Sequence, residues 1–203
     1  MMELLQLKDK IKCYGEVPRV GKDTLKFTEV VSKQKGKKVL DLGTGSGFIG
    51  IYLALEGREV TSSDINPNAL EVAKENAFNL NAEIKFILSD LFNNIHDKFD
   101  LILFNPPMGN TTGKRRFEFV KRLIPKTKLT LKLATSLFTN ARKDLLKRFV
   151  ISGRYHLTEK GCMMILLHQN EREYLESLTG KDKIEVIEHY DFYNNFEIIK
   201  VHR

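Results

Sequence analysis

The sequence predicts an α/β domain with a doubly wound, seven-stranded, mostly parallel sheet, and two observations support this expectation. Short apolar runs alternate with helical stretches along the chain, which is the pattern of βαβ units. Residues 99–104 are almost continuously apolar, as expected for a central parallel strand that is covered on both faces. The length of 203 residues suits one domain. We therefore assign residues 1–203 to a single domain, in which residues 1–35 form a polar N-terminal arm.

The individual elements follow from the apolar periodicity and from the residues that end each run. Strands are expected at residues 38–42, 59–64, 84–88, 99–104, 162–167, 185–191 and 196–202. Helices are expected at 48–56, from Pro67 to about Leu80, and at 172–178. Gly57 ends the first of these helices, and the turn at 193–195 joins the last two strands. Seven strands with helices between them leave no segment for a second domain.

More than fifty residues separate the fourth and fifth strands, and residues 109–154 of this segment form a basic insert. The insert holds thirteen Lys and Arg residues but only two acids, whereas the whole chain has a net charge of +7. Residues 117–124 and 145–150 have helical spacing, while 129–137 fits a strand or a helix. A solvated helix face is the simple explanation of such charge. The scarcity of acids favours an anionic partner, and RNA is the natural candidate.

Several functional classes find no support in the sequence. No apolar run reaches the roughly 18–20 residues that a membrane span needs, and residues 1–12 do not resemble a signal peptide. We therefore expect a cytoplasmic protein without a membrane partner. Cys13 and Cys162 have no metal-like or redox-like spacing, and the histidines form no metal-like cluster, so no metal is expected. The oligomeric state is left open.

A glycine-rich turn, Asp-Leu-Gly-Thr-Gly-Ser-Gly at residues 41–47, follows the first strand. Glycines let the backbone turn tightly and approach a ligand, but such a turn also occurs in dinucleotide-binding enzymes. Asp64 ends the second strand, at about the right distance to bind both hydroxyls of a ribose. Asp90 follows the third strand at the same sheet edge. These strand ends predict one wall of a nucleoside site.

The acids decide which nucleoside is favoured. A pyrophosphate binds helix N-terminal amides and is repelled by acids such as Asp41, whereas S-adenosylmethionine carries a sulfonium and an ammonium group. Residues 39–47, 64–67 and 89–90 resemble the successive motifs of class I S-adenosylmethionine-dependent methyltransferases, and the resemblance extends over about residues 36–109. It implies a Rossmann-like methyltransferase fold, with the glycine loop on the methionine part, Asp64 on the ribose and Asp90 on the adenine amine. The candidate cofactor-binding residues are Thr24, Asp41, Gly43, Thr44, Gly45, Gly47, Asp64, Ile65, Asp90, Leu91 and Asn105.

The fourth strand is followed by Asn105, Pro106, Pro107 and Met108, which are the candidate catalytic residues. Two prolines can simply end a strand. However, amide and aromatic amine nitrogens are poor nucleophiles, and acceptors for their N–H groups can orient them toward a methyl group. The Asn105 side chain and the Pro106 main chain offer two such carbonyls, and neither proline has a competing N–H.

This tetrapeptide resembles the Asn/Asp-Pro-Pro-aromatic motif of amino-methyltransferases, which act on exocyclic nitrogens of nucleobases or on the glutamine amide of release factors. Met108 stands where an aromatic residue is usual, and a thioether covers a flat group more weakly than a ring does. Residues 17–24 resemble the Pro-Arg-x-x-(Asp/Glu)-Thr segment of release-factor glutamine methyltransferases and their small relatives, where it lies over the cofactor. A plain N-terminal turn is the alternative interpretation.

The sequence thus predicts an S-adenosylmethionine-dependent N-methyltransferase that acts on a planar nitrogen, first of all in RNA, such as adenine N6 or guanine N2. Lys114, Arg115 and Arg116 closely follow the tetrapeptide and are the candidate substrate-binding residues. Methylation of a protein glutamine is the alternative within the enzymes. A catalytically weak cofactor-binding module that serves as an RNA-binding or partner subunit is the third interpretation, and it rests on Met108.

Overall fold

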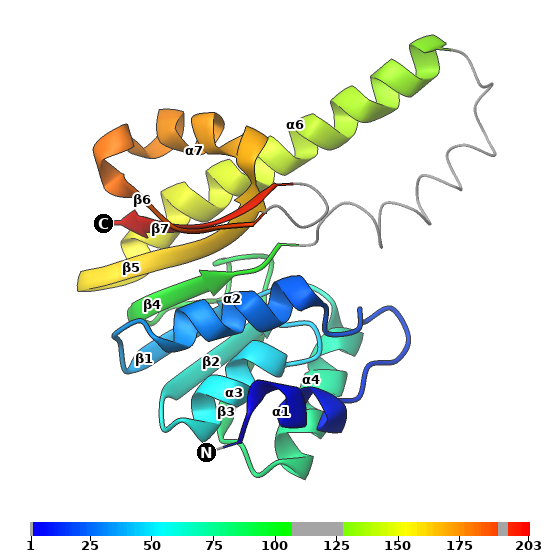
Figure 1. The fold of residues 1–203 in the computed structure, drawn as a ribbon, viewed down its shortest axis with the longest axis vertical. Helices are drawn as coiled ribbons and strands as arrows, with labels where there is room; N and C mark the ends of the chain where they lie inside the picture. The colour runs from blue at the N-terminus through cyan, green and yellow to red at the C-terminus, as the bar shows by residue number, and fades with distance from the viewer. Residues whose placement is uncertain (1, 107–127, 191–194) are drawn as a thin grey trace.

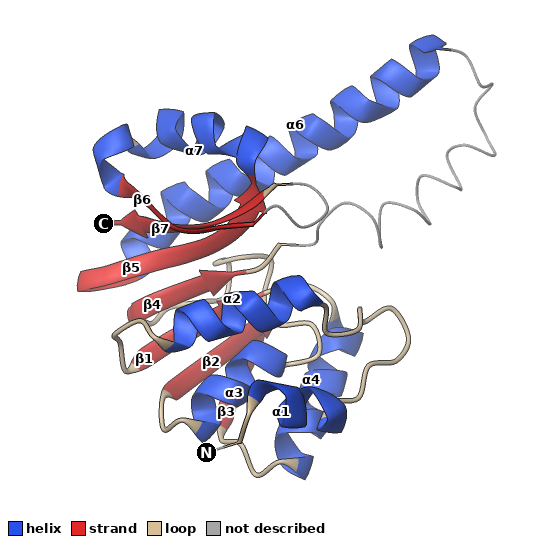
Figure 2. Cartoon of the chain, viewed as in Figure 1, coloured by secondary structure: helices blue, strands red, loops and turns tan. Residues whose placement is uncertain are grey.

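The computed structural model describes residues 2–106, 128–190 and 195–203, and for residues 128–139 it describes the backbone alone. The helices are α1 (Leu4–Lys10), α2 (Lys22–Ser32), α3 (Phe48–Leu55), α4 (Pro67–Asn79), α6 (Lys128–Gly153) and α7 (Arg172–Thr179), with short 3₁₀ turns η1 (Arg154–His156), η2 (Gln169–Glu171) and η3 (Lys181–Lys183) (Figure 1). The strands are β1 (Lys38–Leu42), β2 (Glu59–Asp64), β3 (Ile84–Leu88), β4 (Phe99–Phe104), β5 (Leu157–His168), β6 (Ile184–Tyr190) and β7 (Phe196–His202) (Figure 2).

The seven strands form one sheet in the order β3-β2-β1-β4-β5-β7-β6. The pairs among β1 to β5 are parallel, and β7 lies antiparallel between β5 and β6. The chain starts at β1, runs outward to β3 and then returns to β4 on the other side of β1. The expected doubly wound, mostly parallel sheet is therefore confirmed, and its switch point lies between β1 and β4.

Alternate side chains of the central strands face two separate cores. Val39 and Leu101 pack with α2 and α3 on one face, whereas Leu40 and Ile102 pack with α6 on the other. All four of these side chains are completely buried. The near-continuous apolar run of β4 thus reflects burial on both faces of the sheet, as expected.

Two expectations from the sequence need correction. The N-terminal arm is not simply polar, because α1 and α2 bury Leu7 and Phe27 against the sheet-facing core. Strand β5 begins at Leu157 rather than at residue 162, because Leu157 already pairs with Phe99 at the start of β4, and the register shifts before Cys162 pairs with Leu101. Gly161 therefore lies within the strand and does not precede it; a Cβ on Gly161 would lie 2.8 Å from the Phe99 carbonyl oxygen.

The basic insert contains one long helix in its described part. Helix α6 begins at Lys128 and includes both the ambiguous stretch 129–137 and the expected helix 145–150. It has no proline and no glycine before Gly153, so nothing in the sequence interrupts it. Its first half extends beyond the sheet, and its second half covers one face (Figure 1). The expected helix 117–124 lies outside the described residues.

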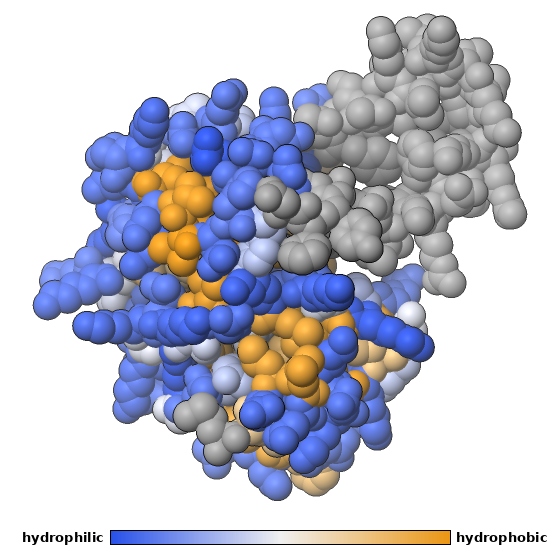
Figure 3. Space-filling view, viewed as in Figure 1, coloured by the Kyte–Doolittle hydropathy of each residue, from blue (hydrophilic) through white to orange (hydrophobic). Residues whose placement is uncertain are grey.

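The surface of the described part is mainly hydrophilic on the face in view, with one apolar area beside β6 and another beside α1 and α3 (Figure 3). No described helix has the length and apolar character needed to cross a membrane. Within the same residues there is no group of His, Cys, Asp and Glu side chains that could hold a metal, and both cysteines are free thiols.

Candidate functional site

A cavity of about 420 Å³ opens at the carboxyl ends of β1, β2, β3 and β4. This is the switch point of the sheet, where ligands of open α/β folds bind, and the volume is typical of small-molecule sites, which are roughly 300–1,000 Å³. Its lining combines the ends of these four strands with the segment before α2 and with one residue of α6, Leu145. The cavity therefore brings together most of the residues that the sequence singled out.

The glycine loop forms the floor of the cavity through Gly43, Thr44 and Gly45. Gly47 lies behind the loop, does not line the cavity and has a φ of +83°. A Cβ at this position would lie 3.1 Å from the Ala73 Cβ, so the glycine is required where α3 starts against α4. Gly47 thus shapes the loop from a position outside the cavity lining, and its role in cofactor binding stays a prediction.

Asp41 also lies behind the loop rather than in the cavity lining, and it is 1% exposed. Its Oδ2 accepts a 2.6 Å hydrogen bond from the Thr44 hydroxyl. Burial raises the pKa of Asp41 to about 7, although the bond from Thr44 acts in the opposite direction. We therefore place Asp41 as a support of the loop, and a direct cofactor contact from it finds no support in this geometry.

Asp64 joins the ends of two strands. Its Oδ2 accepts the Gly45 N–H at 3.0 Å, and its Oδ1 accepts the Asn66 N–H at 2.9 Å. Each carboxylate oxygen retains a second lone pair, so both oxygens can still accept a hydroxyl. The neighbouring Ile65 is 66% exposed and lines the cavity, as does Asp64. This arrangement fits a ribose that sits over the end of β2.

Asp90 and Leu91 line the cavity beyond the end of β3. Leu91 has a φ of +48°, an uncommon conformation for a residue with a side chain. The Asp90 carboxylate is paired with Arg148 of α6, with 2.6 Å between Oδ2 and Nη2. No pattern in the sequence predicted this partner, which belongs to the basic insert.

Asn105 is half-buried at the end of β4 and lines the cavity. Its side-chain Nδ2 donates to the Thr24 hydroxyl at 3.3 Å, and no described residue donates a hydrogen bond to its Oδ1 carbonyl, which can therefore act as an acceptor. Pro106 is buried next to it. Pro107, Met108 and the basic residues Lys114, Arg115 and Arg116 lie outside the described residues. Thr24, expected as a cofactor residue, thus also orients the candidate catalytic amide.

The segment before α2 covers the cavity and is more than a plain turn. Val17 and Val20 are buried, while Arg19 lines the cavity together with Glu16. The cavity lining of the described residues therefore includes three acids and one arginine. Such a set fits S-adenosylmethionine, which combines a sulfonium, an ammonium, a ribose and one carboxylate.

Two residues of this region, Leu145 and Asn76, were not predicted from the sequence. Leu145 lines the cavity, although its spacing indicated only a helix that docks on the sheet. Asn76 of α4 is 1% exposed and donates to the Ser46 carbonyl at 2.9 Å, while it also bonds the Lys12 main chain. A buried asparagine in an otherwise amphipathic helix is the signal that could have revealed this contact.

Some of the basic side chains of the insert bind groups within the same domain. Arg142 forms an ion pair with Glu171, and Arg148 with Asp90. Arg154 donates to the Thr179 carbonyl at 3.0 Å. These three side chains therefore hold α6 and its end against the domain, which weakens the inference that the whole insert serves an anionic partner.

Comparison with known proteins identifies the family. The family model described as the methyltransferase small domain matches residues 18–146. This chain belongs to the methyltransferase small domain family. The match runs from the segment over the cavity through all four strands that form it and into α6. The resemblance to class I methyltransferases noted in the sequence is thereby confirmed.

The methyltransferase domain has similar relatives among curated proteins. It is 43% identical over 110 residues to a Methanocaldococcus jannaschii protein provisionally named as a protein N5-glutamine methyltransferase, which covers 54% of this chain and 56% of that protein. It is 41% identical over 110 residues to the release factor glutamine methyltransferase of Lactococcus lactis, covering 52% of this chain and 40% of that protein. The chain thus spans about half the length of these relatives.

Among solved structures, the domain is similar to a 16S rRNA N2 methyltransferase of Thermus thermophilus in complex with AdoMet and guanosine, with a TM-score of 0.65 and 16% identity. The similarity covers 91% of this chain and 43% of that one. At this level of identity it shows the common fold alone.

Proposed function

We propose that this methyltransferase domain transfers a methyl group from S-adenosylmethionine to the side-chain amide nitrogen of a glutamine in a protein. The geometry of Asn105 carries the proposal. Its amide nitrogen is bound to Thr24, and its carbonyl is left at the cavity edge as an acceptor. A primary amide has two N–H groups, which the Asn105 Oδ1 and the Pro106 main-chain carbonyl can accept together.

These two acceptors perform the orienting step of the reaction. The cofactor, when bound, supplies an electrophilic methyl group on its sulfonium. The amide nitrogen of a glutamine is planar, with its lone pair delocalised into the carbonyl. Hydrogen bonds from both N–H groups fix the direction of the nitrogen relative to the methyl group and favour a more tetrahedral nitrogen. Asp64 and the glycine loop keep the cofactor in place while Asn105 positions the acceptor.

The names of the similar curated relatives favour glutamine over a nucleobase, because these relatives are named for glutamine methylation. Met108 does not discriminate between the two substrates, since an aromatic residue is usual at this position in both groups of enzymes.

Label transfer from cofactor with a tritiated methyl group tests the proposal. The purified chain is incubated with the labelled cofactor and an extract that supplies the substrates. After the reaction, samples are treated with nuclease or with protease, and the label that stays in macromolecules is counted. We expect protease-sensitive, nuclease-resistant label. Strong acid should release it as volatile methylamine, because hydrolysis of an N-methylated glutamine amide gives glutamate and methylamine. Asn105→Ala serves as the inactive control. Label that disappears with nuclease would contradict the glutamine assignment.

A nucleobase in RNA is the second candidate, and the thirteen basic residues of the insert favour it. Phosphate binding predicts that affinity falls with salt, by about 0.7–0.9 in log–log slope for each neutralised phosphate. Changing Lys114, Arg115 and Arg116 together to Glu should then flatten this slope and leave cofactor affinity unchanged. RNA affinity that does not respond to salt, together with no methylation of RNA by the unaltered chain, would exclude this candidate. Full RNA methylation by the triple variant would show that these three residues do not bind the substrate.

A further inference from the structure

The loop after β3 has a backbone that is fixed without help from the Asp90 side chain. The Ser89 hydroxyl donates to the Leu91 carbonyl at 2.8 Å and accepts the Asn94 N–H at 3.0 Å. The Asn94 side chain donates to the Leu88 carbonyl at 2.7 Å. These bonds hold the Asp90 main chain at the cavity edge, and they leave its carboxylate to be oriented by another partner.

Arg148 of α6 is that partner. Its Nη2 donates to Asp90 Oδ2 at 2.6 Å, and Asp90 Oδ1 has no hydrogen-bond partner among the described residues. The two side chains are 41% and 38% exposed, so their ion pair contributes little to the stability of the fold. Its main physical effect is to restrict the carboxylate to one orientation, with Oδ1 left as the acceptor.

The position of Arg148 is itself well defined. The adjacent Phe149 is completely buried and packs on Phe104, with 5.0 Å between ring centroids. Leu145 lies three residues earlier, on the same side of the helix, and lines the cavity. One side of α6 thus supplies both an apolar contact to the cavity and the cation that binds Asp90.

We propose that Arg148 is a positioning residue for purine recognition: it fixes Asp90 so that Oδ1 accepts an N–H of the exocyclic amine of adenine. This inference rests on the proposed function, because it requires S-adenosylmethionine in the cavity. Arg148 makes no contact with the cofactor itself and acts through Asp90. The basic insert would therefore contribute to cofactor selectivity through Arg148.

Calorimetric titration with two ligands tests this role. One ligand is S-adenosylhomocysteine, and the other is its analogue with unsubstituted purine in place of adenine, which lacks the amine. The wild type should bind the adenine ligand about tenfold more tightly or better, which corresponds to about 1.4 kcal/mol. In Arg148→Gln the ratio of the two affinities, adenine ligand over purine ligand, should fall below about threefold, and only the affinity for the adenine ligand should decrease. Arg148→Lys should recover part of the ratio.

The control is Arg142→Gln, which removes an ion pair of the same helix with Glu171 outside the cavity. It should keep the wild-type ratio. Asp90→Asn should lower the ratio as Arg148→Gln does, and the double variant should lose nothing more. Melting curves establish that each variant is folded.

Three results would overturn the inference. An unchanged ratio in Arg148→Gln would show that Asp90 needs no partner. Equal weakening of both ligands would show a purely structural role. Tighter binding of the adenine ligand would show that Arg148 competes with the purine for Asp90. Failure of the proposed function has a different signature: a wrong substrate assignment would leave the wild-type ratio and its loss in Arg148→Gln unchanged, and a cavity that does not take the cofactor would give a wild type that binds neither ligand.

Discussion

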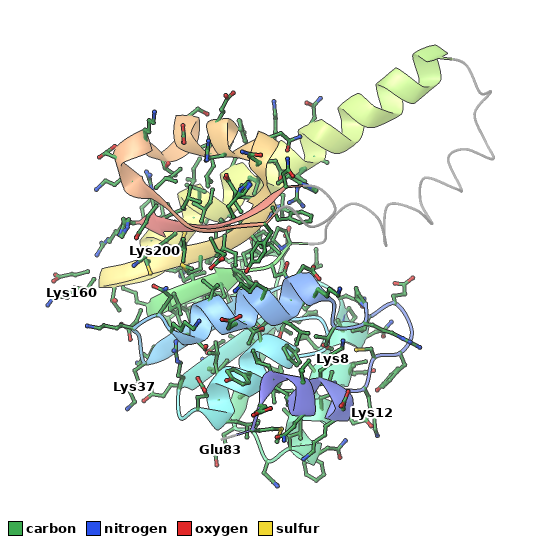
Figure 4. All side chains as sticks on the ribbon, in the orientation of Figure 1. Lys8, Lys12, Lys37, Glu83, Lys160 and Lys200 are labelled. Atoms are coloured by element: carbon green, nitrogen blue, oxygen red, sulfur yellow. The ribbon has the colours of Figure 1, made fainter. Side chains whose placement is uncertain are left out.

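Replacement of Asn76 by alanine tests how one buried amide joins the N-terminal segment to the glycine loop. Asn76 accepts the Lys12 N–H and donates to the Lys12 and Ser46 carbonyls, each at 2.9 Å. Lys12 lies in the segment between α1 and α2, on the opposite side of the view from Lys37, which precedes the amino end of β1 (Figure 4). The three bonds thus connect parts of the chain that no strand pairing connects.

The magnitude follows from the burial of this side chain, which is 1% exposed. A hydrogen bond contributes about 1 kcal/mol net, and an unsatisfied buried partner costs about 1–3 kcal/mol. Asn76→Ala should therefore lower the free energy of unfolding by about 3 kcal/mol. For a chain of this size, this corresponds to a fall in melting temperature of about 6–12 °C. Urea denaturation and calorimetry measure the two quantities, and cofactor affinity should fall as well because Ser46 belongs to the glycine loop.

The matched control is Glu75→Ala. Glu75 is the neighbour of Asn76 and also contacts the same N-terminal segment, through Lys12 Nζ at 2.8 Å and the Tyr14 hydroxyl at 2.7 Å. These contacts are exposed to solvent, so their loss should matter far less than the loss of Asn76. If the two variants lose equal stability, or if Asn76→Ala loses less than about 1 kcal/mol, the amide is not a structural connection.

Three further changes test the site. Thr24→Val should lower kcat about five- to tenfold, because one neutral hydrogen bond orients Asn105, and Thr24→Ser should restore it. Asn105→Ala should lower kcat about a hundredfold with near-normal cofactor affinity, and equal loss of both would indicate a structural role. The pKa of Asp41 is higher in the fold than in the unfolded chain, so its contribution to stability is present below about pH 4 and is lost as the pH rises to about 7. The free energy of unfolding of Asp41→Asn, measured by urea denaturation, should therefore rise by about 2 kcal/mol relative to that of the wild type as the pH is raised from about 5 to about 8. A difference between the two proteins that does not change with pH would contradict a raised pKa of the buried Asp41 carboxyl.

The sequence predicted the parts of this protein that local patterns determine. Strands β1, β3 and β4 are short, mostly apolar runs, whereas Val60 is the one apolar residue of β2, which ends at Asp64; the bounds of all four strands agree with the expected ones. Because parallel strand ends meet at one edge, Asp64, Asp90 and Asn105 were correctly expected around one cavity. Their individual roles in catalysis and binding stay predictions.

The remaining features depend on partners that are distant in the sequence. Arg148 meets Asp90 across 58 residues, and Asn76 meets Lys12 across 64. A lysine-rich and arginine-rich segment looks the same whether its charges face solvent or bind carboxylates in the same domain. Helices α1 and α2 were missed because Leu7 and Phe27 stand among charged residues, and only the fold shows that they share a buried side.

The place of β7 inside the sheet has a consequence for how the chain folds during synthesis. β5 carries seven consecutive buried residues, Gly161–Leu167, and the edge of β5 that faces away from β4 is paired by β7. β6 is synthesised before β7, yet among the described strands it pairs with β7 alone. A nascent chain that has reached β6 therefore exposes an apolar strand edge that awaits its partner. Such edges promote aggregation, so the interval between the synthesis of β5 and that of β7 is a period in which this chain is exposed to misassembly.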